Sequence, residues 1–155
     1  EICDAIAVTI LGLRRDTIQS CLAAKGFTFD NIEQVQKTYA TSFEATLRAF
    51  VRYCTFSAAG AYCEMDGGLI AGEAHHFITR RAYNSSSFSP MITAEQRLSG
   101  VTCLTNAMRR KGQVYSGLEC ITLGTQSREL QAEAKRMIFY MDGKPKDGVV
   151  LLLKA

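Results

Sequence analysis

The sequence has few of the features that mark disordered, secreted or membrane-spanning chains. It contains two prolines among 155 residues, and 47% of its residues are hydrophobic while 21% are charged, so a folded body is expected. Its longest apolar runs, such as 149–153, are far too short to cross a bilayer. The acidic Glu1 and Asp4 stand where a secretory signal would be basic. We therefore expect a cytoplasmic protein that does not associate with membranes.

Cysteine pairs at the spacing of metal sites or redox dithiols are also missing. The six cysteines lie at positions 3, 21, 54, 63, 103 and 120, and no two of them form a C-x-x-C pair. In a cytoplasmic chain they are expected to be reduced thiols that pack as small apolar side chains. The alternative is a thiol-based or metal-based sensor formed by Cys54, Cys63, Cys103 and Cys120.

Histidine is scarce, because only His75 and His76 occur in the chain. A zinc peptidase of the H-E-x-x-H type needs two histidines one helical turn apart, with a glutamate between them that activates water. Neighbouring residues of a strand point to opposite faces, so these two histidines cannot replace that motif. The chain as given is predicted to be non-catalytic and to bind zinc weakly or not at all.

The first 52 residues have the periodicity of helices. Apolar residues recur every three or four positions, as on the buried face of a helix, and pairs of residues three apart have the pattern of capping boxes at helix starts. The tight connection 40–42 between the last two helices gives them the arrangement of a helix-turn-helix. The first apolar stripe is Ile2, Ile6, Ile10 and Leu13, and the last is Phe43, Leu47 and Val51. The capping pairs are Asp16 with Gln19, Asp30 with Glu33, and Thr41 with Glu44.

From residue 53 onward the pattern is that of strands. Alternating or continuous apolar runs separated by turn signals predict strands, and one helix is expected with Ser99 as its cap and Gly112 as its stop signal. Mostly antiparallel strands around one or two helices make an α+β domain. The boundaries expected are therefore a helical segment at 1–52 and a sheet domain at 53–155. The strand-like runs are 54–65, 76–83, 114–123, 130–141 and 149–153, with a turn-rich connection at 142–148.

Two parts of the sequence resemble the ImmA/IrrE family of zinc metallopeptidases. Glu1-Ile-Cys-Asp-Ala-Ile-Ala7 with Ile10-Leu11, then 32–39 and Thr41-Ser-Phe-Glu-Ala-Thr-Leu-Arg48, are similar to the region that follows the family's zinc motif. The stretch 81–90, the helix after Ser99, Gly117-Leu-Glu119, 132–134 and 149–152 are similar to the carboxy-terminal GAF-like domain of longer members. Together the matches span nearly the whole chain.

The resemblance implies the regulatory part of a peptidase that cleaves an XRE-like helix-turn-helix transcriptional repressor in response to DNA damage or stress. The zinc would belong to the parent protein, with no cofactor in this chain. The family's third zinc ligand, a glutamate, falls close to Glu1, although the macrodipole also favours an acidic residue in a first helical turn. Two alternatives are an autonomous small-ligand-binding GAF-like module and a nucleic-acid-binding adaptor.

Two sets of candidate binding residues follow. The paired helices would contact DNA through Lys37, Arg48 and Arg52, and the net charge of +3 permits such contact without demanding it. A GAF-like domain would enclose a cavity for a small molecule or single-stranded DNA that acts as the signal. Tyr83 and Phe88 are expected to staple the serine-rich loop to the core. The expected cavity walls are Tyr62, Phe77, Arg81, Ser85, Ser86, Ser87, Phe88, Cys103 and Glu119.

Overall fold

The structure is a computed structural model that describes residues 13–67 and 75–155. These residues form four helices and one six-stranded sheet, so the expected combination of helices with an antiparallel sheet is confirmed. The helices are α2 (Arg15–Lys25), α3 (Phe29–Tyr39), α4 (Phe43–Tyr53) and α5 (Thr102–Arg109). The strands are β1 (Ala58–Asp66), β2 (His76–Asn84), β3 (Arg97–Ser99), β4 (Val114–Leu123), β5 (Gln126–Met141) and β6 (Lys144–Lys154).

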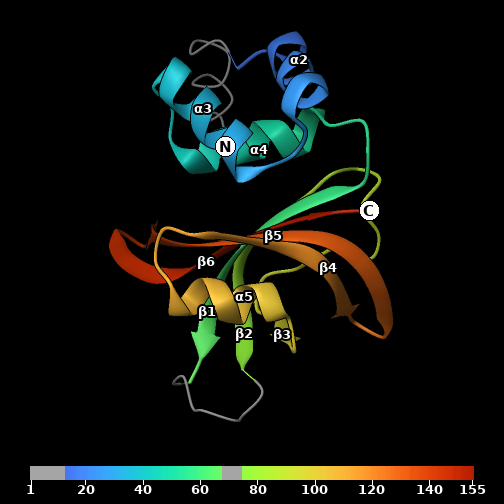
Figure 1. Ribbon diagram of the computed structural model, residues 1–155, viewed down its shortest axis with the longest axis vertical. Coiled ribbons are helices and arrows are strands. Elements are labelled where there is room, and N and C mark those ends of the chain that lie inside the picture. The colour runs from blue at the N-terminus through green and yellow to red at the C-terminus, as the bar shows by residue number, and fades with distance from the viewer. Residues whose placement is uncertain (1–12, 68–74) are drawn as a thin grey trace.

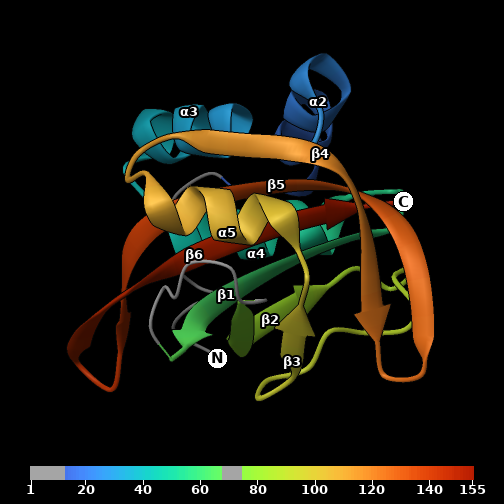
Figure 2. The ribbon, with the colours of Figure 1, turned by 60° about the horizontal axis from the view of Figure 1, so that its bottom comes forward.

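The sheet has the strand order β3-β2-β1-β6-β5-β4, and every neighbouring pair is antiparallel. The first and last of the described strands, β1 and β6, therefore lie side by side at the centre of the sheet. Helix α5 carries the chain from the β3 edge to the β4 edge (Figure 2). Helices α2, α3 and α4 lie on one face of the sheet, named here the helical face, and α5 lies on the other, named the α5 face (Figure 1).

The core of the helical face is rich in aromatic side chains. Helix α4 buries Leu47 and Val51, two members of its apolar stripe, against the sheet. Leu47 packs over Gly60 of β1, where an added Cβ would lie 2.8 Å from Leu47 Cδ1, so the missing side chain lets α4 approach closely. Ring contacts within this core join Phe29 with Phe43 at 5.7 Å and Tyr62 with Phe139 at 5.0 Å between centroids.

The core of the α5 face is built mainly from aliphatic and small side chains. Leu104 and Ala107 of α5 are fully buried there. The loop after β2 adds Phe88, which is buried in the same core, so the expectation that Phe88 staples this loop is confirmed. The strands contribute small residues to this face, among them Ala59, Ala61, Cys63, Ala132 and Ala134.

The helices start close to the expected positions, but their caps differ from the predicted capping boxes. Thr28 and Ser42 cap α3 and α4 by accepting from the backbone N–H three residues later, and no side chain caps α2 at Arg14. The second member of each predicted pair contacts another segment instead. Gln19 donates to the Tyr53 carbonyl, and Glu33 and Glu44 form ion pairs with Lys135 and Arg81 of the strands. The spacing of three residues is compatible both with a capping box and with contacts to other segments. In the folded chain the contacts with other segments prevailed.

The last hairpin differs most from the sequence prediction. A two-residue turn at Asp142-Gly143, both with positive φ, replaces the predicted connection 142–148, and β6 begins at Lys144. Pro145 is tolerated because residues 144–148 pair only with β5, while pairing with β1 begins at Val149. On such an exposed strand edge, proline removes no ladder hydrogen bond.

The helical segment and the sheet share one hydrophobic core. Side chains from α2, α3 and α4 pack with Ala58, Tyr62, Val150 and Leu152 of the strands, so this core crosses the expected boundary at 52/53. None of the described helices is both long and apolar enough to span a membrane. The first predicted helix, the candidate metal ligand Glu1, and Cys3 lie outside the described residues.

Candidate ligand groove

The residues predicted to line one cavity lie on both sides of the sheet. Tyr62 belongs to the core of the helical face, and Arg81 reaches α4 on that same side. Phe77, Phe88 and Cys103 are buried in the core of the α5 face. Glu119 is turned toward the start of α5. The sheet separates these two groups, so the predicted set does not form a single pocket.

An open groove of about 980 Å³ lies instead between α4 and the end of β2. It brings together Arg81 and Ser86 from the predicted cavity with Arg48 and Arg52 from the predicted DNA contacts. Lys37, on the exposed side of α3, is not among the groove residues. The lining, named here the arginine groove, is Ser42, Glu44, Ala45, Arg48, Ala49, Val51, Arg52, Tyr53, Arg81, Ala82, Tyr83, Asn84, Ser85 and Ser86.

One face of α4 supplies the charged wall of this groove. Glu44, Arg48 and Arg52 are spaced four residues apart, so they lie in one row along the helix. The adjacent apolar stripe, with Leu47, is buried against β1. Burial of the apolar stripe therefore fixes the direction in which the two arginines point.

Glu44 joins the two walls of the groove. Its Oε2 accepts from Arg81 Nη1 at 2.8 Å, and its Oε1 accepts a hydrogen bond from the Tyr83 hydroxyl. Burial, followed by the hydrogen bond to Glu44, raises the pKa of Tyr83, and burial is also the main cause that raises the pKa of Tyr62. Both phenols are therefore protonated at neutral pH, and Tyr83 is a hydrogen-bond donor.

The remaining arginines are held over aromatic rings. The Arg48 guanidinium lies 5.2 Å from the Tyr83 ring centroid, and that of Arg52 lies 5.7 Å from the Tyr53 ring centroid. These cation–π contacts orient the planar guanidinium groups over the rings. Among the described residues that line the groove there are three arginines and one carboxylate, a composition that suits an anionic ligand.

The floor at the serine-rich loop is rigidly tied to the strands. Ser85 is buried, and its hydroxyl accepts from Ala58 N–H and donates to the Phe56 carbonyl. The Asn84 side chain accepts from and donates to the backbone of Ile92. Ser86 is exposed at the groove. Of the serines predicted at this site, Ser86 is therefore the one placed to contact a ligand, while Ser85 has a structural role.

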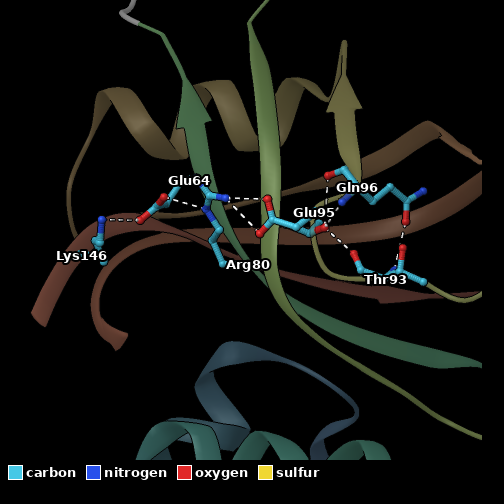
Figure 3. A network of polar contacts seen from close by, with 7 residues as sticks. Glu64, Arg80, Thr93, Glu95, Gln96 and Lys146 are labelled. Carbon is cyan, nitrogen blue, oxygen red and sulfur yellow. Dashed lines mark hydrogen bonds and ion pairs between the residues drawn. The ribbon is translucent and has the colours of Figure 1, made fainter. Parts of the chain in front are cut away.

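A second cluster of charges does not form a chemically active pair. Figure 3 shows Arg80 between Glu64 and Glu95, with Lys146 on the other side of Glu64. Both glutamates are engaged by Arg80 at 2.8 Å, and the hydrogen bonds to both are the main causes that raise the pKa of Arg80. Carboxylates neutralised in this way serve to pin the loop that carries Glu95 onto the sheet.

The histidines and cysteines are dispersed. His76 Nδ1 lies 2.6 Å from the Ser99 hydroxyl, while His75 is buried just before β2. Within residues 13–67 and 75–155, no three His, Cys, Asp or Glu side chains are grouped so that they could hold a metal ion. Of the four cysteines considered as a sensor, Cys63 and Cys103 are buried, Cys54 is half-buried and Cys120 is exposed.

Sequence reasoning missed the partners that assemble the groove. Glu44 was assigned to the backbone at the start of its own helix, yet it bonds to Arg81 and Tyr83. Tyr83 packs against the core of the helical face, as expected, and it also lines the groove. The row Glu44, Arg48 and Arg52 on one helix face was the one signal in the sequence that pointed to this wall.

The described fold and groove define a mixed α/β protein with a candidate anion-binding site between helices and sheet. Comparison of the sequence with models of known protein families and with curated proteins gave no match.

Proposed function

We propose that this chain is the carboxy-terminal regulatory part of an ImmA/IrrE-type zinc metallopeptidase, and that its sheet domain is GAF-like. The parent protein would cleave an XRE-like helix-turn-helix repressor in the cytoplasm in response to DNA damage or stress. Zinc would be held by the parent, and this chain, which lacks H-E-x-x-H, would be non-catalytic. The motif resemblance supports the family, and the six-stranded antiparallel sheet with helices on both faces is compatible with the proposed domain.

The arginine groove is the observation that carries the regulatory role. Its volume of about 980 Å³ lies at the upper end of the usual range for small-molecule sites. Planar guanidinium groups bind phosphate through paired N–H donors, and Arg52 and Arg81 line the groove from its two walls. We infer that its ligand is a small phosphate-bearing molecule such as a nucleotide.

Binding of such a ligand would change the contacts of Glu44. A phosphate that approaches Arg81 and Tyr83 competes with the Glu44 carboxylate for the same donors. The Glu44 carboxylate therefore lowers the affinity for the ligand, because the ligand must replace hydrogen bonds that already exist within the protein. Removing its charge is expected to strengthen binding.

The position of the groove explains how a ligand would act on a peptidase. One wall belongs to α4 of the helical segment, and the other belongs to β2 and the serine-rich loop of the sheet domain. By the resemblance, the helical segment completes the peptidase. A ligand that binds one arrangement of these two walls more tightly than another shifts the population toward that arrangement.

The test is a binding assay on the full chain with groove variants. Calorimetry with nucleoside triphosphate, inorganic phosphate, single-stranded DNA and duplex DNA would be run over a series of salt concentrations. Arg52→Ala is expected to weaken nucleotide binding at least about tenfold, because one charged hydrogen bond is worth about 1.5–3 kcal/mol. Glu44→Gln is expected to strengthen it. The matched control is Arg109→Ala, at the exposed end of α5.

Each alternative function has its own outcome. DNA binding that falls steeply with salt and weakens on Lys37→Ala would favour the nucleic-acid adaptor. Nucleotide affinity that Arg52→Ala and Arg109→Ala reduce equally would contradict the groove as the site. For the peptidase, the coding sequence upstream of Glu1 is decisive: H-E-x-x-H roughly thirty residues earlier would support it, by the spacing such zinc sites need, and its absence would favour an autonomous module.

A further inference from the structure

The two edges of the sheet differ in how well they are protected. At one edge β3 has three residues, and its Arg97 lies 3.3 Å from Asp66 in an ion pair. At the other edge β4 has ten residues, paired to β5 in an unbroken register from Val114 to Leu123. Proteins usually protect edge strands with short length, charge, proline or bulges. Strand β4 has none of these along its outward side.

The single charged residue of β4 does not protect its edge. Glu119 is buried, and its carboxylate accepts from the backbone N–H of Thr102 and Cys103 at the start of α5. Leu118 is instead 62% exposed and Val114 is 44% exposed. Both point to the helical face, together with the exposed Ser116 between them. An apolar, uncharged edge of this kind is a template for another strand.

The amino-terminal half of β4 is the accessible part. The carboxy-terminal half curls toward β3, and Thr122 and Leu123 line the same hollow as Arg97 and Ser99. The segment Val114–Leu118 precedes this region. It is five residues long, which is the usual length of a strand.

We propose that Val114–Leu118 pairs antiparallel with the same segment of a second copy of this chain, extending the sheet across a two-fold axis. Pairing centred on Ser116 places Val114 of each copy opposite Leu118 of the other, so the two exposed apolar residues cover each other twice. The segment carries no charge, so two copies do not repel each other. Antiparallel pairing is also the arrangement of all five neighbouring strand pairs in the sheet.

The test compares the oligomeric state of the full chain with that of two lysine variants. Leu118→Lys puts a charged side chain opposite Val114 at both ends of the paired segment, in place of an apolar contact, and is expected to weaken dimerisation at least about tenfold. Tyr140→Lys is the matched control, because Tyr140 is 64% exposed and lies on the β5–β6 hairpin instead. Sedimentation velocity over a concentration series should show a dimer for the unsubstituted chain and for the control, and a monomer for Leu118→Lys.

Hydrogen exchange at the amides of residues 114–118 gives a second readout. Protection of these amides should rise with protein concentration in the parent chain and in Tyr140→Lys. If Leu118→Lys is poorly folded by circular dichroism, Ser116→Lys replaces it. The proposal is overturned if the unsubstituted chain stays monomeric at the highest attainable concentration. It is also overturned if the dimer persists in Leu118→Lys or is lost in Tyr140→Lys.

Discussion

The two faces of the sheet have different cores, but on both of them polar side chains of the strands bind the starts of helices. On the helical face, three helices cover an aromatic core, and Glu133 of β5 accepts from the Phe29 N–H at the start of α3. On the α5 face, one eight-residue helix covers a core of small and aliphatic side chains, and Glu119 of β4 accepts two N–H groups at its start. Carboxylates on strands thus satisfy the free donors of helix starts on both faces.

Strand β5 serves both faces through adjacent residues. Lys135 pairs with Glu33 of α3 on the helical face. Arg136 donates to the carbonyl of Met108 in the last turn of α5 and pairs with Asp147 of β6. The side chains alternate between faces, as the pleat requires, so one strand anchors both layers. The difference between the faces lies in the number of helices and the size of the core residues.

Because the same strands form both faces of the sheet, the two cores should unfold in one transition. A destabilising substitution in one core should therefore lower the denaturant concentration at which the other core becomes exposed. Leu47→Ala, on the helical face, is expected to lower the free energy of unfolding by about 2–5 kcal/mol, as large-to-small changes at fully buried leucines do. The buried thiol of Cys103 on the α5 face reports on the other side. Denaturant unfolding followed by circular dichroism and by Cys103 labelling, in a background where the other cysteines are serine, measures both.

The midpoints from the two probes should coincide and shift together. Ile138→Ala, at an exposed position on β5, is the control and should have little effect. If Leu47→Ala moves the circular dichroism transition and leaves the Cys103 transition unchanged, the helical segment and the sheet domain unfold separately, as the expected boundary at 52/53 would require.

The sequence predicted the elements better than the contacts between them. The stripe containing Leu47 and Val51 predicted the buried face of α4 because helical periodicity is local. Strand 114–123 was predicted at its observed bounds, because its apolar pattern is also local in the sequence. The cap of α5 was predicted at Ser99, but it comes from Glu119, seventeen residues after Thr102. Such a contact exists only once the strand is paired, and no local pattern encodes it.

The candidate site shows the same limit. Arg48 and Arg52 were assigned to a DNA surface and Arg81 and Ser86 to a separate cavity, yet they line one groove. These four side chains come together only when β2 pairs with β1 and α4 packs on Gly60 of β1. The residues themselves could be selected from the sequence, because their types suit anions. The way they are grouped depended on long-range packing.

The two carboxylate caps should differ in strength. Glu119→Gln is expected to cost about 1–3 kcal/mol, because a buried pair of N–H groups loses a charged acceptor. Glu133→Gln is expected to cost less than about 1 kcal/mol, because Glu133 is half-buried, accepts from one N–H, and the amide oxygen can still accept it. Chemical denaturation of both variants measures this difference.

Glu129→Gln is the control for both changes, because Glu129 is exposed on β5 and surface substitutions away from such contacts are usually neutral. Equal losses for Glu119→Gln and Glu133→Gln would mean that the carboxylates contribute through general charge and not through the helix starts. A larger loss for Glu133→Gln would reverse the comparison between the faces.

The smallest expected effect concerns the ion pair of Arg136 with Asp147, which secures the hairpin on the α5 face. The hydrogen bond from Arg136 lowers the pKa of Asp147 below its ordinary value of 3.8. The stabilising contribution is therefore present above pH 3.8 and is lost as the pH falls through the lower pKa of the folded state. Because Asp147 is about half exposed, the contribution should be below about 1 kcal/mol.

Asp147→Asn removes that contribution, so the free energies of unfolding of the parent chain and the variant should differ slightly at neutral pH and converge in acid. Urea denaturation at a series of pH values between neutrality and the acid limit of folding measures the difference. A gap that stays constant into acid would show that the amide disturbs packing, because a charge effect must vanish once the carboxyl is protonated. High salt should also narrow the gap at neutral pH, since exposed pairs are screened, whereas the effect of Leu47→Ala on the helical face should be insensitive to both pH and salt.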